Sequence, residues 1–169
     1  MSLPEFYQNL TLDLKNKFAS AILNISNYQG DVLITVSLDS IIEVLTFLKN
    51  EHRFIYLCDM VAADRFTSED RFEVIYNIIS LKAQKRLFIK TRCSEENPTI
   101  PTSIGIWPAA NWHEREAFDM FGIQFEGHPD LRRLFLPEDF DYYPLRKEFP
   151  LLGIPGSLPL PSTTPDSKA

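Results

Sequence analysis

Charged side chains that could carry out chemistry are concentrated in the stretch Trp107–Ile123, WPAANWHEREAFDMFGI. Glu114, Glu116 and Asp119 would lie on one helix, and paired carboxylates can serve as general acid and base. Glu116 and Asp119 are three residues apart, so their charges are neighbours, while Arg115 precedes Asp119 by four residues and is placed to pair with it. The stretch therefore predicts either an acid–base site or an ion-paired helix face that the chain's own tail or a partner covers.

A metal site is the second chemistry that the stretch suggests. His113 and the glutamate after it resemble the start of a zinc-protease helix, but that motif needs a second histidine four residues later, where this chain has Ala117. His52 falls at the end of a predicted helix and His128 in a turn, where its ring can bond nearby backbone. A metal site would need all three histidines to converge, and we expect none on this chain.

Other reaction centres lack their usual motifs. The sequence contains no G-x-S-x-G, no P-loop and no G-x-G-x-x-G, and six glycines leave little for a loop that cradles phosphate. Cys58 and Cys93 are half of the thiolates that a four-cysteine iron–sulfur site needs, and we expect both to be buried and reduced. We therefore expect neither a catalytic residue nor a cofactor on this chain.

The composition is that of a soluble globular domain. The 169 residues are 44% hydrophobic and carry a net charge of −6, which suits one domain with a core. The acidic balance argues against a nucleic-acid partner, which favours basic surfaces. The N-terminus has no basic region followed by an apolar one, and the apolar run 54–63 is about half a membrane span. We expect membrane contact only through other proteins.

The first third of the chain predicts two helices around a hairpin. Apolar residues at i, i+4 spacing predict a helix over 3–18. β-Branched runs on either side of Gln29–Asp31 predict two strands and a turn. A second helix is predicted over 37–52, with Ser37 as its N-cap. Its apolar stripe consists of Ile41, Ile42, Leu45 and Leu48.

Three further strands complete the predicted sheet. Residues 53–64 are apolar on both faces at their start, as expected of a central strand. Residues 71–81 and 86–93 alternate, and the short polar links 65–70 and 82–85 predict hairpins. The order α-β-β-α-β-β-β predicts an α/β two-layer (α+β) domain, a mixed β-sheet with helices on one face. A helix and an extended C-terminal tail follow it.

The last third of the chain differs in character. Its helix begins near Pro108 or Asn111, where Glu114 would complete a capping box, and Gly122 ends it. Six of the twelve prolines lie from Pro144 onward among apolar residues, so this end of the chain is suited to lie extended along another protein. We divide the chain into a globular domain 1–106, a helix plus extended segment 107–150 and a proline-rich tail 151–169.

Three ordered motifs in residues 107–150 resemble the thirty-kilodalton (C) subunit family of respiratory complex I, the proton-pumping NADH:quinone oxidoreductase. NWHEREAFDMFGI resembles the family's E-R-E helix, GHPDLRRLFLP its next element and YPLRKEFPL its closing element. We expect the residues that carry the match to serve as family signature or partner interface. They are Glu114, Arg115, Glu116, Asp119, Phe121, Gly122, His128, Pro129, Arg132, Arg133, Pro144, Leu145, Arg146 and Lys147.

The resemblance implies a cofactor-free, non-catalytic subunit of the peripheral arm, needed for assembly and stability. It implies a tail that wraps the D subunit, which forms the quinone-reducing end together with the B subunit. FMN, iron–sulfur clusters and quinone would belong to the rest of the complex, which transfers electrons from NADH to quinone and translocates protons. The place of such a subunit is the cytoplasmic side of the bacterial inner membrane, held there through the complex.

Two alternatives stay open. The homologous subunit of a membrane-bound hydrogenase or another donor-dependent quinone reductase would carry the same motifs. A free-standing small enzyme would instead use the carboxylates of the helix. On the first interpretation, we expect the signature arginines to form charge-assisted bonds, some within the chain and some to the D subunit. These are Arg115, Arg132, Arg133 and Arg146.

Overall fold

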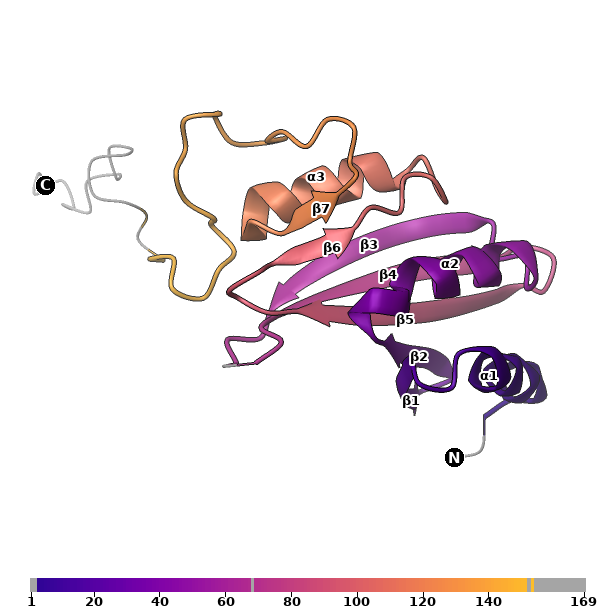
Figure 1. Ribbon diagram of the computed structural model, residues 1–169. Helices are drawn as coiled ribbons and strands as arrows, with labels where there is room; N and C mark the ends of the chain where they lie inside the picture. Colours follow the sequence, from indigo (N-terminus) through magenta and orange to yellow (C-terminus); the bar gives the residue numbers. More distant parts are fainter. Residues whose placement is uncertain (1–2, 68, 152, 154–169) are drawn as a thin grey trace, which may run out of the picture.

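The computed structural model describes residues 3–67, 69–151 and 153, which form three α-helices, a short 3-10 helix and seven strands (Figure 1). The helices are α1 (Glu5–Lys17), the 3-10 helix η1 (Leu38–Ser40), α2 (Ile41–Asn50) and α3 (Ala110–Phe121). The strands are β1 (Ile22–Tyr28), β2 (Asp31–Val36), β3 (Tyr56–Asp64), β4 (Phe72–Ser80), β5 (Lys85–Cys93), β6 (Thr99–Pro101) and β7 (Gln124–Glu126). The predicted order of helices and strands up to β5, and the helix that follows, are confirmed.

Five of the strands form a mixed sheet in the order β1-β2-β5-β4-β3. Neighbours are antiparallel except β2 and β5, which are parallel. The three predicted hairpins form. The prediction that residues 53–64 make a central strand is wrong, because β3 lies at an edge and β5 in the middle. β3 is apolar on both sides because one side packs against α3 while the other carries the exposed Tyr56 and Val61.

The helices cover one face of this sheet, as predicted. Alternate residues of β4 and β5 are buried beneath them, among them Val74, Tyr76 and Ile89. α2 crosses in front of β4 and β5, and α3 runs along β3 (Figure 1). Burying a large apolar side chain contributes about 1.5–3 kcal/mol, so this side of the sheet holds the core. The opposite side is only partly shielded, because the residues between the buried ones are partly or fully exposed.

Four local predictions are settled by the backbone and side chains. Ser37 precedes η1 rather than α2, and its side chain makes no capping hydrogen bond. Asn111 lies inside α3, and no side chain caps the start of that helix, so the capping box is wrong. Cys58 is exposed on the edge strand β3, contrary to prediction, whereas Cys93 is buried. Gly122 ends α3 as predicted, in the left-handed conformation with φ 76°.

The strands β6 and β7 pair as a small parallel sheet, and in the sequence one lies before α3 and the other after it. Strands of three residues are too short to show periodicity, so the sequence did not predict them. β6 precedes and β7 follows the boundary proposed at 106/107, and the two sides of that boundary therefore share backbone hydrogen bonds. The division into three parts stays a prediction. Apart from Leu151 and Gly153, the tail 151–169 lies outside the described residues.

Candidate functional site

Glu114 is fully buried where α3 meets the turn after β6. Its carboxylate accepts hydrogen bonds from Thr102 Oγ1 (2.6 Å), the Ser103 amide (2.7 Å) and Ser103 Oγ (2.8 Å). Hydrogen bonds to a charged group are worth about 1.5–3 kcal/mol, so this side chain fixes the helix on the turn. A carboxylate closed off from solvent and engaged in three bonds is built for structure rather than for acid–base chemistry.

Asp119 is also fully buried, and it fastens the loop that follows β7. Its Oδ2 accepts the amides of residues 134–136 at 3.0, 2.6 and 3.1 Å, and its Oδ1 accepts the Arg133 guanidinium at 2.8 Å. Burial alone would raise the pKa of Asp119, but the Phe135 amide and Arg133 outweigh it and hold the pKa below its ordinary value. The predicted pair between Asp119 and Arg115 is wrong, because the loop supplies the counter-charge.

Two of the signature arginines bind this same loop. Arg115 donates to the carbonyls of Arg132 and Arg133 at 3.2 and 3.1 Å, and its guanidinium lies 5.1 Å from the Trp112 ring centroid. Arg133 also donates to the carbonyl of Phe140. Arg132 differs, since its largely exposed side chain bonds to Asp130 on the surface at 3.0 Å. The expected charge-assisted bonds are therefore found inside the chain, and the bonds to a partner stay a prediction.

Arg146 docks the next segment of the loop onto the end of α3. Its Nε donates to the Phe121 carbonyl at 2.7 Å, and its guanidinium lies 4.5 and 5.0 Å from the ring centroids of Tyr143 and Phe72. Gly122 makes this approach possible, because a Cβ there would meet Arg146 Nη2 and the Tyr143 ring at 2.7 Å. Glycine is thus required at this position both by its positive φ and by the space.

A buried ion pair that the sequence analysis missed holds the last part of the loop. Arg71 donates to both oxygens of Asp64, at 2.9 and 2.7 Å, and also bonds Glu148. The Lys147 amide donates to Asp64 Oδ2 at 2.8 Å. Burial raises the pKa of Asp64, but Arg71 and then the Lys147 amide outweigh it and bring the pKa to about 2. The predicted hairpin at 65–70 was the available signal, since it places Asp64 beside Arg71.

The remaining signature residues lie at the surface or in turns. The His128 ring accepts the Asp130 amide at 3.0 Å, a backbone bond of the kind predicted for that turn. Glu116, Pro129, Leu145 and Lys147 are exposed, and Pro144 is half-buried. Large apolar side chains on α3 and after it also face outward. They are Trp112, Phe135, Tyr142, Leu145 and Leu151, which we call the loop surface.

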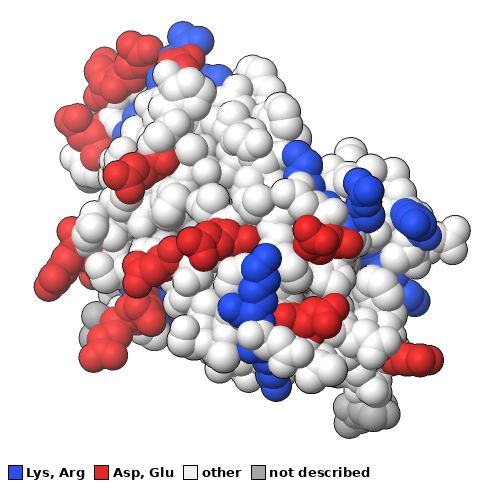
Figure 2. Space-filling view, turned by 45° about the vertical axis from the view of Figure 1, so that its right-hand side comes forward, with Lys and Arg blue, Asp and Glu red and all other residues white. Residues whose placement is uncertain are grey.

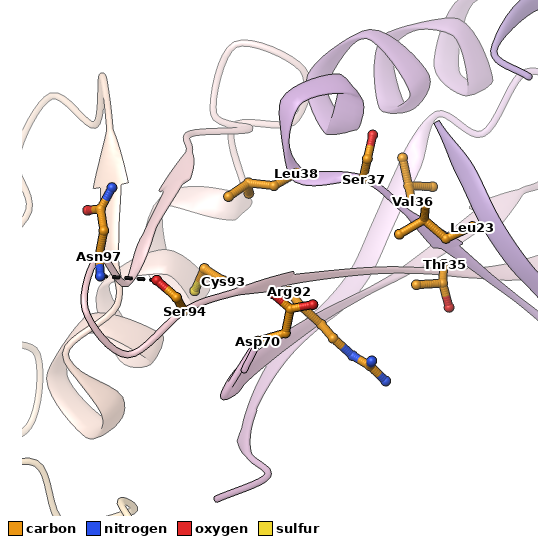
Figure 3. A pocket seen from close by; sticks show the side chains of 10 residues that line it. All are labelled: Leu23, Thr35, Val36, Ser37, Leu38, Asp70, Arg92, Cys93, Ser94 and Asn97. Atoms are coloured by element: carbon orange, nitrogen blue, oxygen red, sulfur yellow. Dashed lines mark hydrogen bonds between the residues drawn. The ribbon is translucent and has the colours of Figure 1, made fainter. Parts of the chain in front are cut away.

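A cavity of about 380 Å³ opens at the carboxyl ends of the parallel strands β2 and β5 (Figure 3). Burial raises the pKa of the Cys93 thiol to about 12, so this thiol is protonated at neutral pH. Arg92, at the same cavity, is bonded to Glu73 at 2.9 Å. Within residues 3–67, 69–151 and 153, no group of three His, Cys, Asp or Glu side chains could hold a metal ion.

Surface charge gives no sign of a nucleic-acid site on the face seen in Figure 2. Acidic side chains spread over the left of that face, and the lysine and arginine side chains in its middle and on its right are interrupted by further acidic ones. A phosphate backbone would favour a continuous basic band. Among the described helices, none is long and apolar enough to cross a membrane.

The fold is that of a small α+β protein. Its buried signature residues on α3 hold the loop that follows β7 in place. A family model described as the respiratory-chain NADH dehydrogenase 30 Kd subunit matches residues 34–154. That match spans most of the chain, and the chain therefore belongs to this family. The resemblance found in the three motifs is confirmed.

Curated relatives and solved structures agree. The C subunit of the NADH-quinone oxidoreductase of Geotalea uraniireducens (strain Rf4) is 44% identical over 142 residues, 84% of this chain and 87% of the relative. A C subunit of the same enzyme from Rhizobium meliloti (strain 1021) is 45% identical over 139 residues, 80% and 75% of the two chains. A structure of the trypsin-resistant fragment (1-134) of Nqo5 is 31% identical with a TM-score of 0.65, covering 74% of this chain and 98% of that one. A chain of the archaeal membrane-bound sulfane sulfur reductase is 25% identical with a TM-score of 0.76, covering 88% of each.

Proposed function

We propose that this chain is a non-catalytic, cofactor-free subunit of the peripheral arm of proton-translocating NADH:quinone oxidoreductase, needed to assemble and stabilise the quinone-reducing module. FMN, the iron–sulfur clusters and quinone would be held elsewhere in the complex, which carries electrons from NADH to quinone. The chain would sit on the cytoplasmic side of the inner membrane and reach the membrane only through the complex.

The observation that carries the proposal is that the C-terminal part of the chain buries charged signature residues and leaves large apolar side chains exposed. Glu114, Asp119 and Arg133 are engaged inside the chain, whereas the loop surface leaves large apolar side chains outside. Phe135 and Leu145 are 66% and 53% exposed. Aromatic and apolar side chains that project from a rigid support are typical anchors of a protein interface.

The D subunit is the proposed occupant of the loop surface, with the B subunit nearby, and the tail 151–169 would continue along D. The signature residues act in this scheme as positioning residues. Glu114, Asp119, Arg115, Arg133 and Arg146 hold the loop in the shape that the D subunit receives. Two large exposed side chains of the loop surface, Phe135 and Leu145, then make the contact.

The test is recovery of the complex with a chain tagged at its N-terminus. The tagged chain replaces the native copy in its host, and we purify it from detergent-solubilised membranes, identify the co-purifying subunits and assay NADH:quinone reduction. We expect recovery of the D and B subunits with inhibitor-sensitive activity. Leu145→Asp should abolish both, while Leu12→Asp, on the equally exposed Leu12 of α1 (58%), should not. Recovery of the wild-type chain alone would refute the proposal.

A second candidate has a specific observation in its favour. The sulfane sulfur reductase chain matches 88% of this chain, which supports a homologous role beside a different electron donor. In that case the purified complex would lack an NADH-oxidising module, as a hydrogenase or another donor-dependent reductase does. A free-standing carboxylate enzyme is disfavoured, because Glu114 and Asp119 are buried and bonded.

A further inference from the structure

The five-stranded sheet has a second face, which no helix of the described chain covers and which we call the helix-free face. Its apolar side chains alternate with the core residues. On the inner strands they are Leu33, Phe88, Ile75 and Ile79, and on the edge strands Tyr28, Tyr56 and Val61. Tyr28, Tyr56 and Val61 are 75%, 54% and 51% exposed. An antiparallel sheet that faces water normally carries polar side chains there.

These side chains are neighbours across the strands. Leu33 stands opposite Phe88, Phe88 opposite Asn77, and Ile75 opposite Val61. Together they line a mostly apolar hollow of about 420 Å³. Contiguous apolar surface of this kind marks a protein contact more often than a solvated face.

The centre of the hollow contains an unused hydrogen-bond acceptor. The Asn77 Oδ1 is shielded from solvent and accepts no hydrogen bond from any described residue. A buried acceptor without a donor costs about 1–3 kcal/mol.

One end of the helix-free face is basic. Arg65, Lys90 and Arg92 converge on a single carboxylate, Glu73, at 3.3, 3.2 and 2.9 Å. Burial raises the pKa of Glu73, but Arg92 and Lys90 outweigh it and lower the pKa, so this carboxylate is charged. Three cations against one carboxylate leave positive charge in excess, although the chain as a whole carries −6.

The other end of the face carries two acidic side chains, each with a basic or titratable neighbour. Asp31 bonds Arg86 at 2.7 Å, and Asp59 lies 3.4 Å from the ring of His113. A second copy of this chain would therefore bring the same positive excess, and only the single carboxylate of Asp59 without a permanent counter-charge to set against three cations. Charge complementarity favours a different protein, one with unpaired acidic residues.

We propose that the helix-free face is a second partner-binding surface, which receives a neighbouring subunit through an apolar surface edged with carboxylates. The apolar part of the neighbouring subunit covers the hollow that Asn77 lines, and the carboxylates of that subunit meet Arg65, Lys90 and Arg92. This inference rests on the proposed function for the existence of neighbouring subunits. It adds that the chain is held on two sides, by the loop surface and by the helix-free face.

The experiment uses the tagged, complex-forming chain and measures which subunits stay bound during washing at low salt and at about 0.5 M salt, where exposed charges are screened. Val61→Asp tests the apolar part and Arg65→Glu the basic end, with Tyr28→Ser as a second apolar variant. Leu12→Asp and Lys82→Glu are matched controls away from this face. Circular dichroism melting of each free chain establishes that it folds.

At low salt we expect Val61→Asp and Arg65→Glu to lower the recovery of at least one neighbouring subunit by about tenfold, with both controls near wild type. At high salt the difference between Arg65→Glu and wild type should shrink, because salt screens the exposed charges, while the Val61→Asp loss should persist. Unchanged recovery in all three face variants would overturn the inference while leaving the proposed function intact. A wild-type chain that recovers no subunit would overturn both. A purified chain that dimerises, and that Val61→Asp makes monomeric without changing the complex, would assign the face to a second copy and also overturn it.

Discussion

The loop fastened by α3 and the helix-free face of the sheet differ in how far their side chains find partners within the chain. Along the loop, the buried charges are paired inside the chain, with Asp119 accepting four hydrogen bonds and Arg71 bonding both oxygens of Asp64. Across the helix-free face, apolar side chains such as Val61 and Phe88 lie open, and an acceptor on Asn77 has no donor among the described residues. In the first region the buried carboxylates find their hydrogen-bond donors within the chain, whereas in the second one buried acceptor finds none among the described residues.

The comparison shows that residues that form a recognisable motif need not be the residues that contact a partner. The dense motif WHEREAFDMF contains most of the chemistry-bearing residues, yet its buried members shape the chain itself. The helix-free face has no motif, only residues in alternation, yet it leaves apolar side chains exposed, as the loop surface does. Stability measurements should therefore respond to the buried members of the motif, and association measurements to the exposed side chains of the loop surface and of the helix-free face.

The largest effect on stability should come from Asp119→Ala. The substitution leaves Arg133 and three loop amides without their acceptor, and removing one partner of a buried ion pair costs about 3–5 kcal/mol. Urea denaturation of the purified chain measures this loss. Glu116→Gln, three residues away on the exposed side of α3, should change stability by less than about 0.5 kcal/mol. Equal effects from the two variants would mean that the loop is not fastened by α3.

Gly122→Ala should come next, compared with Gly30→Ala. Both glycines have positive φ, so alanine is strained at each by about 1 kcal/mol, but only at Gly122 would the new Cβ meet Arg146 and Tyr143. We expect Gly122→Ala to cost about 2–3 kcal/mol and to expose the loop to trypsin at Arg146. The difference between the two denaturation midpoints measures the cost of displacing the docked loop. Equal midpoints would mean that Arg146 and Tyr143 do not pack against Gly122.

Acid should loosen the same region through Asp64. Its pKa is about 2 in the folded chain and about 4 when unfolded, so its contribution to stability is present above pH 4 and is lost as the pH falls toward 2. That contribution is about 2 kcal/mol. Unfolding free energies measured from pH 6 to pH 2 should show a fall that is smaller by this amount in Asp64→Asn. Identical pH profiles would mean that Arg71 and the Lys147 amide do not stabilise the charged form.

The smallest effect should come from the helix-free face. Val61→Thr keeps the β-branched shape at a position that is half exposed, so the stability of the free chain should change by less than about 0.5 kcal/mol. Val74→Thr makes the same replacement in the buried layer and should cost about 1–3 kcal/mol. Thermal melting of both variants checks this, and similar losses would show that the face is already packed in the free chain.

Much of the fold could be predicted because local pattern dictates it. The alternation of β4 and the apolar spacing of α1 each point to one element, and Gly122 stops α3 where no side chain favours the required φ. The place of β3 could not be predicted this way. Apolar residues on both faces occur in a central strand, but they also occur in an edge strand with one side under α3 and the other open.

The sequence singled out some residues of the candidate site, but neither all of them nor their contacts. The motif identified Asp119 and Arg133, yet helical spacing alone suggested Arg115 as the partner of Asp119, because contacts between residues distant in the sequence are not visible in a periodicity. Likewise Asp64 and Lys147 stand 83 residues apart. Only the fold brings them together, and no local propensity encodes such a distance.

The position of β5 bears on how the chain is made. β5 is the last of the five strands to leave the ribosome, yet it lies in the middle and joins the β1–β2 hairpin to the β3–β4 hairpin. Until residue 93 has emerged, the two hairpins have no common sheet, and α1 and α2 have only a partial surface to cover. Pairings between distant segments form slowly because the loop must close first. The nascent chain therefore keeps an unfinished core until β5 has emerged, and chaperones that shield apolar strands have their opportunity in that interval.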